Sequence, residues 1–199
     1  MQWLYTLPAK HIIVIGGNHD AILEELGHEE AQKLLSNCHY LLNSFIDIPE
    51  LPQFRFIGCP ISSGKSRNSG FQSEEMKQNA QDFALTLKAT ADENNNKSGI
   101  GGNTGNKNAE KAENAVVVLA THSPSVENLI SILKPDIHCY GHYHDFYGVN
   151  RNRKNKSNSN DKDEDSTFTP AFSICSSIMD GGYSPENFPI VLDWGEHLH

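Results

Sequence analysis

Two continuous runs of β-branched residues constrain the fold of this chain more than any other feature. They are His11–Gly16 (HIIVIG) and Ala115–Ala120 (AVVVLA). Short runs that are apolar at every position and bounded by polar residues are typical of strands buried on both faces. Because helical patterns lie between such runs, the sequence predicts an α/β class, with a mixed sheet layered with helices.

The remaining elements are predicted from periodicity and turn residues. Helices are expected over Gly27–Ser36, Ser73–Thr90 and Pro124–Leu133, the last capped by Ser123 or Ser125. Further strands are expected over Tyr40–Ile48, Phe54–Gly58, Asp136–Tyr140, Phe146–Val149, Phe168–Ser176 and Phe188–Asp193.

Two polar segments interrupt this pattern. Ala91–Asn114 and Asn150–Asp165 are rich in Asn and in Gly or charged residues, and they are too poor in apolar residues to bury a face. We therefore expect a single domain over residues 1–199 with two low-complexity inserts. The first is predicted to be disordered and the second to be the long tip of a hairpin.

Composition excludes several classes of protein. The chain has 199 residues, with 16 Lys plus Arg against 25 Asp plus Glu and a net charge of -9, so nucleic acid is not expected as a generic partner. No apolar stretch approaches the roughly 20 residues of a membrane helix, and no leader is visible, which predicts a cytoplasmic protein without membrane contact. The four cysteines are widely spaced, which indicates reduced, mostly buried thiols.

Histidines follow three of the predicted strands. Because ligands bind beyond the carboxyl ends of strands in open sheets, we expect these three loops to converge. Imidazole nitrogens and an amide oxygen are borderline ligands that suit Zn, Mn or Fe, and neighbouring glycines would allow close backbone approach. The loop residues are Asn18, His19, Asp20, His122, His142 and His144, with Gly16, Gly17 and Gly141 beside them.

The other histidines are interpreted differently. A single histidine beside a turn is more often a hydrogen-bonded structural residue than a ligand. This interpretation applies to His11, His28, His39 and His138.

Three motifs in this order, Gly17–Asp20 (GNHD), Thr121–Pro124 (THSP) and Gly141–His144 (GHYH), resemble the calcineurin-like metallophosphoesterases. The segments LPAKHIIVIGGNHD, FRFIGCP, LKPDIHCYGHYHDFYG and FPIVLD are similar to the small metallophosphoesterase-domain proteins of the phosphodiesterase-like subgroup. The resemblance implies a β-sandwich flanked by helices. It also implies metal-dependent hydrolysis of a small phosphate mono- or diester, whose identity the sequence leaves open.

The resemblance also assigns residue roles. Asn18, His122 and His142 match ligands of the second metal, and His144 matches a ligand of the first. His19 matches the general acid or transition-state stabiliser, and Asp20 would hold its ring. The implied cofactor is a divalent transition metal, Mn, Fe or Zn, as one or two ions.

One part of the family pattern is missing. The family begins with strands ending in Asp-x-His and Gly-Asp, whereas this chain reaches GNHD within its first twenty residues. We therefore expect an N-terminally truncated domain, a weakened two-metal site and self-association through the uncovered edge of His11–Gly16. The alternatives to an active hydrolase are an impaired remnant that binds one metal or a protein partner, and a fragment without independent function.

Overall fold

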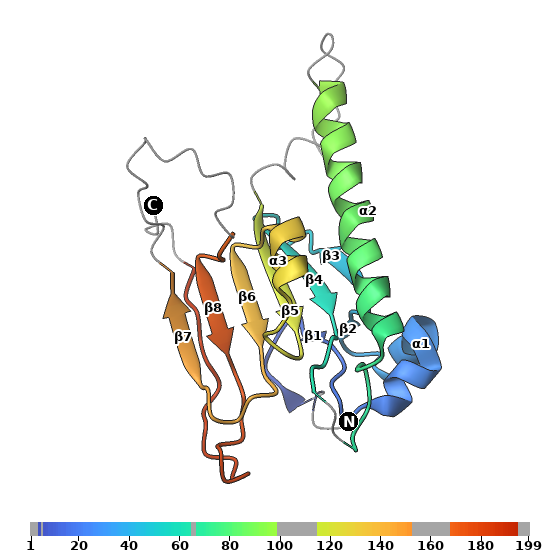
Figure 1. Cartoon of the computed structure of the whole chain (residues 1–199). Helices are drawn as coiled ribbons and strands as arrows, with labels where there is room; N and C mark the ends of the chain where they lie inside the picture. Colours follow the sequence, from blue (N-terminus) through green and yellow to red (C-terminus); the bar gives the residue numbers. More distant parts are fainter. Residues whose placement is uncertain (1–3, 5, 65–66, 99–114, 153–167, 195–199) are drawn as a thin grey trace.

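The computed structural model describes residues 4, 6–64, 67–98, 115–152 and 168–194, which form a mixed α/β fold (Figure 1). Within these residues there are three helices and two sheets. In chain order the elements are β1 (Ile13–Val14), α1 (Ala21–Leu34), β2 (His39–Tyr40), β3 (Ser44–Asp47), β4 (Phe54–Cys59), α2 (Glu74–Ser98), β5 (Val116–Thr121), α3 (Glu127–Leu133), β6 (Ile137–Tyr140), β7 (Gly148–Arg151) and β8 (Phe172–Cys175).

The larger sheet has the strand order β3-β4-β5-β6-β8-β7. Its four central strands are parallel, and β3 and β7 are antiparallel to their neighbours. The parallel pairing of β5 and β6 brings their carboxyl ends to the same edge of the sheet. Thr121 and Tyr140, the last residues of these strands, therefore deliver the following histidine loops to one place.

One face of this sheet packs against α2 and α3. Ile57 and Leu119 from the strands, Ala80 and Ala84 from α2, and Leu129 from α3 belong to one buried core. Leu119, Ala80 and Ala84 have no exposed surface. Small residues on α2 let the helix approach the sheet closely, which explains why this part of the core is fully closed.

A smaller second layer lies over the opposite face. It consists of the parallel pair β1-β2, packed on α1 through a second core that includes Leu23, Leu35 and Tyr40. A side chain at Gly58 of β4 would collide with Leu41 and touch Ile15, which places this layer directly over β4. The rest of that face is apolar: by register it carries the half-buried Val116, Val118, Cys139 and Phe172 and the buried Ile137 and Ile174.

Several predicted elements are confirmed. The strands over Phe54–Gly58, Ala115–Ala120 and Asp136–Tyr140 match β4, β5 and β6 within one residue at each end. The flanks of the second insert form the antiparallel pair β7-β8, as a hairpin requires, and Asn150 and Arg151 at the start of that insert belong to β7. All four cysteines are free; Cys38, Cys59 and Cys175 are buried and Cys139 is half-buried.

The prediction of one strand over Tyr40–Ile48 is wrong. The segment forms two short strands, β2 and β3, which belong to different sheets. Asn43 between them has a φ of 44°, in the left-handed region that interrupts a strand and that asparagine adopts more readily than most residues. The chain therefore passes from the second layer into the main sheet at this turn.

The predicted helix over Gly27–Ser36 is only the second half of α1. Gly27 has a φ of 69°, so the element is kinked there, and Ala21–Leu26 forms a first half that the pattern did not indicate. The Ser73 cap is confirmed, since its hydroxyl accepts a hydrogen bond from the amide of Met76 at 3.1 Å. The helix it begins extends to Ser98, so the first eight residues of the predicted disordered insert are helical.

Three further predictions are corrected. No strand forms over Phe188–Asp193, where Phe188 and Val191 are 80% and 86% exposed, because this segment pairs with no strand of the described sheets. Helix α3 begins at Glu127 after Val126 and has no side-chain cap, so neither Ser123 nor Ser125 caps it. The run His11–Gly16 contributes only the two residues of β1, and Ile12 to Ile15 are half-buried rather than buried.

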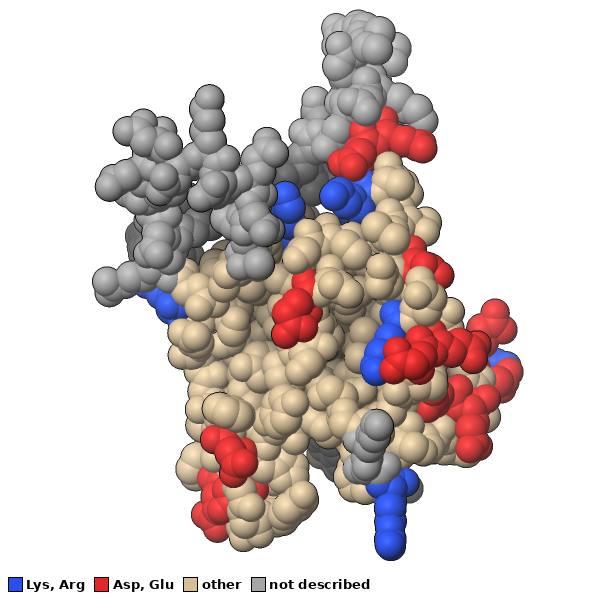
Figure 2. Space-filling model, viewed as in Figure 1, with Lys and Arg blue, Asp and Glu red and all other residues tan. Residues whose placement is uncertain are grey.

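The remaining parts of both inserts, 99–114 and 153–165, lie outside the described residues. On the face of the molecule drawn in Figure 2, acidic side chains gather over α1 and basic ones are scattered among them. None of the helices in the described part of the chain combines the length and apolar character needed to cross a membrane.

Candidate functional site

Three predicted ligands meet at the ends of three strands. Asn18 follows β1, His122 follows β5 and His142 follows β6. The side-chain oxygen of Asn18 lies 2.8 Å from Nε2 of His122, and Nδ1 of His142 lies 3.1 Å from the same nitrogen. Asn18 and His122 are 104 residues apart in the chain, so the fold, not local sequence, creates this contact.

The two strands that carry the histidines come from the main sheet, whereas Asn18 comes from the second layer. The prediction of convergence is therefore correct, although it assumed a single open sheet. A hydrogen bond of 3.1 Å from the amide of Gly141 to the carbonyl of His122 continues the pairing of β5 and β6 into the two loops. This backbone link holds the two histidine-bearing loops side by side.

Close approach between the two layers depends on Gly17. A Cβ atom at this position would lie 2.6 Å from Nδ1 and Cε1 of the His122 ring, which no side chain can tolerate without displacement. Gly16 has the same role against the ring of Phe71. At Gly141, by contrast, a Cβ would meet nothing within 4 Å. The predicted need for glycine is thus confirmed at two of the three positions.

His142 is held in an uncommon backbone conformation. Its φ of 67° lies in the left-handed region, which costs about 1 kcal/mol or more for a residue other than glycine. The surrounding contacts must compensate for this cost. One of them is the edge-on packing of the His142 ring against His122, with centroids 4.8 Å apart. Strain of this kind at a cluster of polar side chains is common in functional sites.

Burial favours the neutral form of both rings. Burial lowers the pKa of His122 to about 4, and the neighbouring His142, His19 and His144 shift it in the same direction. Burial also lowers the pKa of His142, against a hydrogen bond with the backbone of Ser63. Neutral imidazoles offer a lone pair, which is the form that binds a metal ion.

The exposed His19 lies beside the trio on the Asn18 loop. Its Nε2 is 3.2 Å from the side-chain nitrogen of Asn68, in the loop that follows β4. An amide nitrogen can only donate, so Nε2 of His19 accepts and the ring carries its proton on Nδ1. Asn68 is a contact of the site that the sequence did not indicate, because nothing in the 60–70 loop determines its conformation locally.

Asp20 makes a local contact. Its carboxylate accepts a hydrogen bond of 2.9 Å from the amide of Gly17, and its own amide donates to the Gly17 carbonyl at 2.9 Å. These bonds close the turn that presents Asn18 and His19. The role of Asp20 as a partner of the His19 ring stays a prediction.

His144 stands beside the trio. Its ring packs edge-on against Tyr183 with centroids 4.5 Å apart, and it is close enough to lower the pKa of both His122 and His142. Tyr183 is 75% exposed and has a φ of 61°, so an aromatic surface faces solvent next to this histidine. Sequence reasoning missed Tyr183, which lies in an irregular segment without a motif.

The trio has the spacing of adjacent ligands on one ion. Ligand atoms about 2.1 Å from a metal and at right angles to each other are about 3.0 Å apart, close to the observed 2.8 and 3.1 Å. The donor set of two imidazoles and one amide oxygen fits a borderline transition metal. Among the residues that the structure describes, no group of three or more His, Cys, Asp or Glu side chains could hold a metal, so no carboxylate completes this set.

The histidines interpreted as structural all make hydrogen bonds, as predicted. Nε2 of His138 lies 2.8 Å from the Thr121 hydroxyl, and Nε2 of His28 lies 3.0 Å from the Tyr40 carbonyl. His11 and His39 contact each other through ring nitrogens 3.4 Å apart.

Comparisons of the chain with protein-family models, with curated proteins and with solved structures find no match. The resemblance to the metallophosphoesterases therefore rests on the sequence motifs alone.

Proposed function

We propose that this chain is a metal-dependent phosphoesterase of the metallophosphoesterase type, acting on a small phosphate mono- or diester. The observation that carries the proposal is the meeting of Asn18, His122 and His142 at 2.8 and 3.1 Å from three separate strand ends. A chance cluster of polar side chains would not combine ligand spacing, neutral rings and a left-handed His142.

These residues would hold one divalent ion, with water completing its shell. Bound at this place, a divalent ion supplies Lewis-acid catalysis: it stabilises charge on the phosphoryl group and activates water. His144 is the single proposed ligand of the other ion, the first metal of the family pattern, and the described residues offer no group of three or more His, Cys, Asp or Glu side chains that could hold a metal. We therefore expect one tightly held ion and slow hydrolysis.

His19 is the proposed proton donor. It is exposed and follows Asn18 directly in the chain. To protonate a leaving alcohol oxygen, its Nε2 must first take up a proton and exchange its contact with Asn68 for one with the substrate. The mobility that this needs is available to a side chain on the surface.

The alternative function is metal binding without catalysis. It is favoured because the described residues contain no group of three or more His, Cys, Asp or Glu side chains that could hold a metal, whereas catalysis by two ions depends on anionic ligands that offset their charge. The two functions share the site and differ in turnover alone.

The test is metal content followed by turnover. The purified chain is loaded with Mn²⁺, dialysed and analysed for metal; we expect one ion, lost in His142→Ala and retained in the matched variant His144→Ala. Hydrolysis of an aryl phosphodiester with added Mn²⁺ should be slow and should disappear in His142→Ala. Two tightly held ions, or an unchanged metal content in His142→Ala, would contradict the proposal. Metal binding without turnover would leave the non-catalytic alternative.

A further inference from the structure

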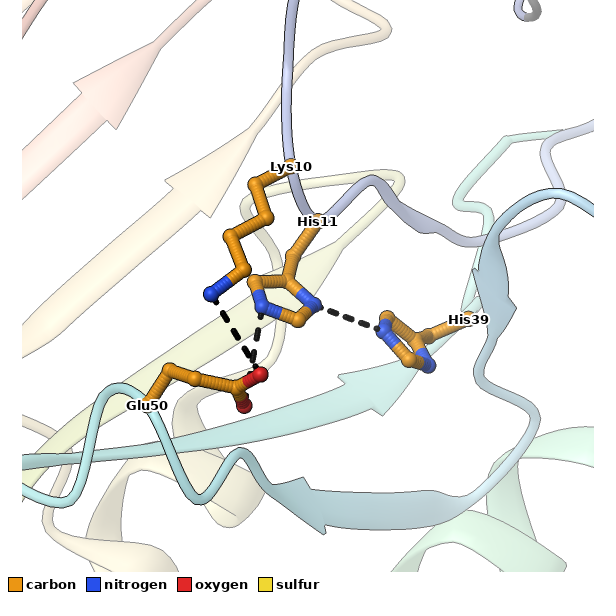
Figure 3. A network of polar contacts seen from close by, with 4 residues as sticks. All are labelled: Lys10, His11, His39 and Glu50. Carbon is orange, nitrogen blue, oxygen red and sulfur yellow. Dashed lines mark hydrogen bonds and ion pairs between the residues drawn. The ribbon is translucent and has the colours of Figure 1, made fainter.

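We propose that His11 and His39 form a second metal-binding site, independent of the proposed catalytic one, for a divalent ion of the Zn²⁺, Cu²⁺ or Ni²⁺ class. Figure 3 shows the two rings facing each other at the junction of β1 and β2, with Glu50 and Lys10 beside them. His11 lies two residues before Ile13, the first residue of β1, and His39, the first residue of β2, pairs with Ile13.

The two nitrogens have the spacing of ligands on one tetrahedral ion. Nδ1 of His11 and Nε2 of His39 are 3.4 Å apart. Two ligands about 2.1 Å from a tetrahedral ion are separated by about 3.4 Å. The ring planes differ by 25° and the centroids are 5.6 Å apart, so the rings meet edge to edge with the two nitrogens facing each other.

Glu50 has the position of an outer-shell carboxylate. Nε2 of His11, the nitrogen opposite the contact with His39, is buried and has no hydrogen-bond partner, yet it lies 3.8 Å from a carboxylate oxygen of Glu50. Metal-bound histidines usually donate their other N–H to such a carboxylate, which fixes the tautomer and raises the basicity of the ligand. A metal ion on Nδ1 requires the His11 ring to carry its proton on Nε2. In the metal-bound form Nε2 would therefore gain Glu50 as its hydrogen-bond partner.

Backbone geometry preorganises the pair. The amide of His39 donates to the Ile12 carbonyl at 2.7 Å, which holds His39 of β2 against the segment that leads from His11 into β1. Lys10, 70% exposed, lies 3.3 Å from the other oxygen of Glu50 and would neutralise the carboxylate without competing for the histidine nitrogens. Two protein ligands leave the other positions to water, so we expect weaker binding than at a four-ligand structural zinc site.

The experiment titrates Zn²⁺ into the double variant His122→Ala/His142→Ala, which lacks two of the three proposed ligands of the catalytic site. Calorimetry should find one ion per chain in this background, and binding should be lost when His39→Gln is added. Glu50→Gln should weaken the affinity about 10-fold, the usual effect of an outer-shell partner. Lys10→Gln is the matched control and should bind at least as tightly as its background. Retained affinity in His39→Gln, or an equal loss in Lys10→Gln and Glu50→Gln, would overturn the proposal.

A second measurement does not depend on variants. The measurement is the nitrogen NMR spectrum of the histidine rings in the unmodified chain. With Zn²⁺ bound, the His11 ring should carry its proton on Nε2, and Nε2 of His39 should carry none. A doubly protonated or unchanged His11 ring at saturating Zn²⁺ would show that no ion sits between the two rings. Failure of the catalytic site leaves this result unaffected, because the two sites share no residue.

Discussion

The hydroxyl of Thr121, the last residue of β5, lies 2.8 Å from Nε2 of His138, the second residue of β6, and both residues are buried. Because the same hydroxyl donates to the carbonyl of Ser123 at 2.7 Å, its oxygen accepts a hydrogen bond from Nε2 of the histidine. Nε2 of His138 therefore carries a proton and is the donor in this hydrogen bond. The bond ties the end of β5, from which His122 continues, to β6, the strand that leads to His142.

Acid should destabilise the fold through His138. Burial lowers the pKa of His138 to about 4, from an ordinary value of 6.5. The unfolded chain thus takes up a proton that the folded chain refuses, so stability falls as pH drops from 6.5 towards 4. The full effect is about 3 kcal/mol below pH 4. Urea unfolding at several pH values should show this slope reduced in His138→Gln, and an identical slope in both proteins would contradict the assignment.

A methyl group at Gly17 should disturb the candidate site. Gly17→Ala places a Cβ 2.6 Å from the His122 ring, so the ring must move away from Asn18 and His142. We expect a loss of about 1–3 kcal/mol in unfolding free energy, as for other overpacked positions, together with weaker Mn²⁺ binding. Gly141→Ala, next to His142 but with open space around it, is the matched control and should retain both properties. Equal effects of the two substitutions would refute the collision.

The parts of the fold that could be predicted from the sequence are those determined by interactions between residues close together in the chain. The continuous run that forms β5 and the Ser73 cap of α2 each act within a few residues, so their pattern is readable. The split at Asn43 and the irregular path of Phe188–Asp193 depend on which strands are available as partners, and that is a property of the whole sheet. For the same reason, motif order predicted the meeting of Asn18 with His122 but not the contact between His19 and Asn68.

The low-complexity inserts should be dispensable. Residues 99–114 contain Ile100 and two alanines as their apolar content, so their removal sacrifices little hydrophobic burial. We expect that replacing 99–114 by a short Gly-Ser linker changes the unfolding free energy by less than about 1 kcal/mol and leaves metal content intact. Limited proteolysis of the full chain should cut first in 99–114 and 153–165. Protection of those segments, or unfolding after their replacement, would show that they pack on the domain.

The open side of the second layer should make the chain self-associate. Among the described strands, β1 pairs with β2 alone, and Ile12 to Ile15 are half-buried over an apolar sheet face. An unpaired strand edge of this kind recruits another strand, and a charged side chain on the edge opposes such pairing. Sedimentation at several concentrations should therefore show concentration-dependent association that Ile13→Lys weakens. The matched variant Ile22→Lys, at a 57% exposed position of α1, should associate like the parent chain. A monodisperse monomer of 22.1 kDa at every concentration would show that the edge needs no partner.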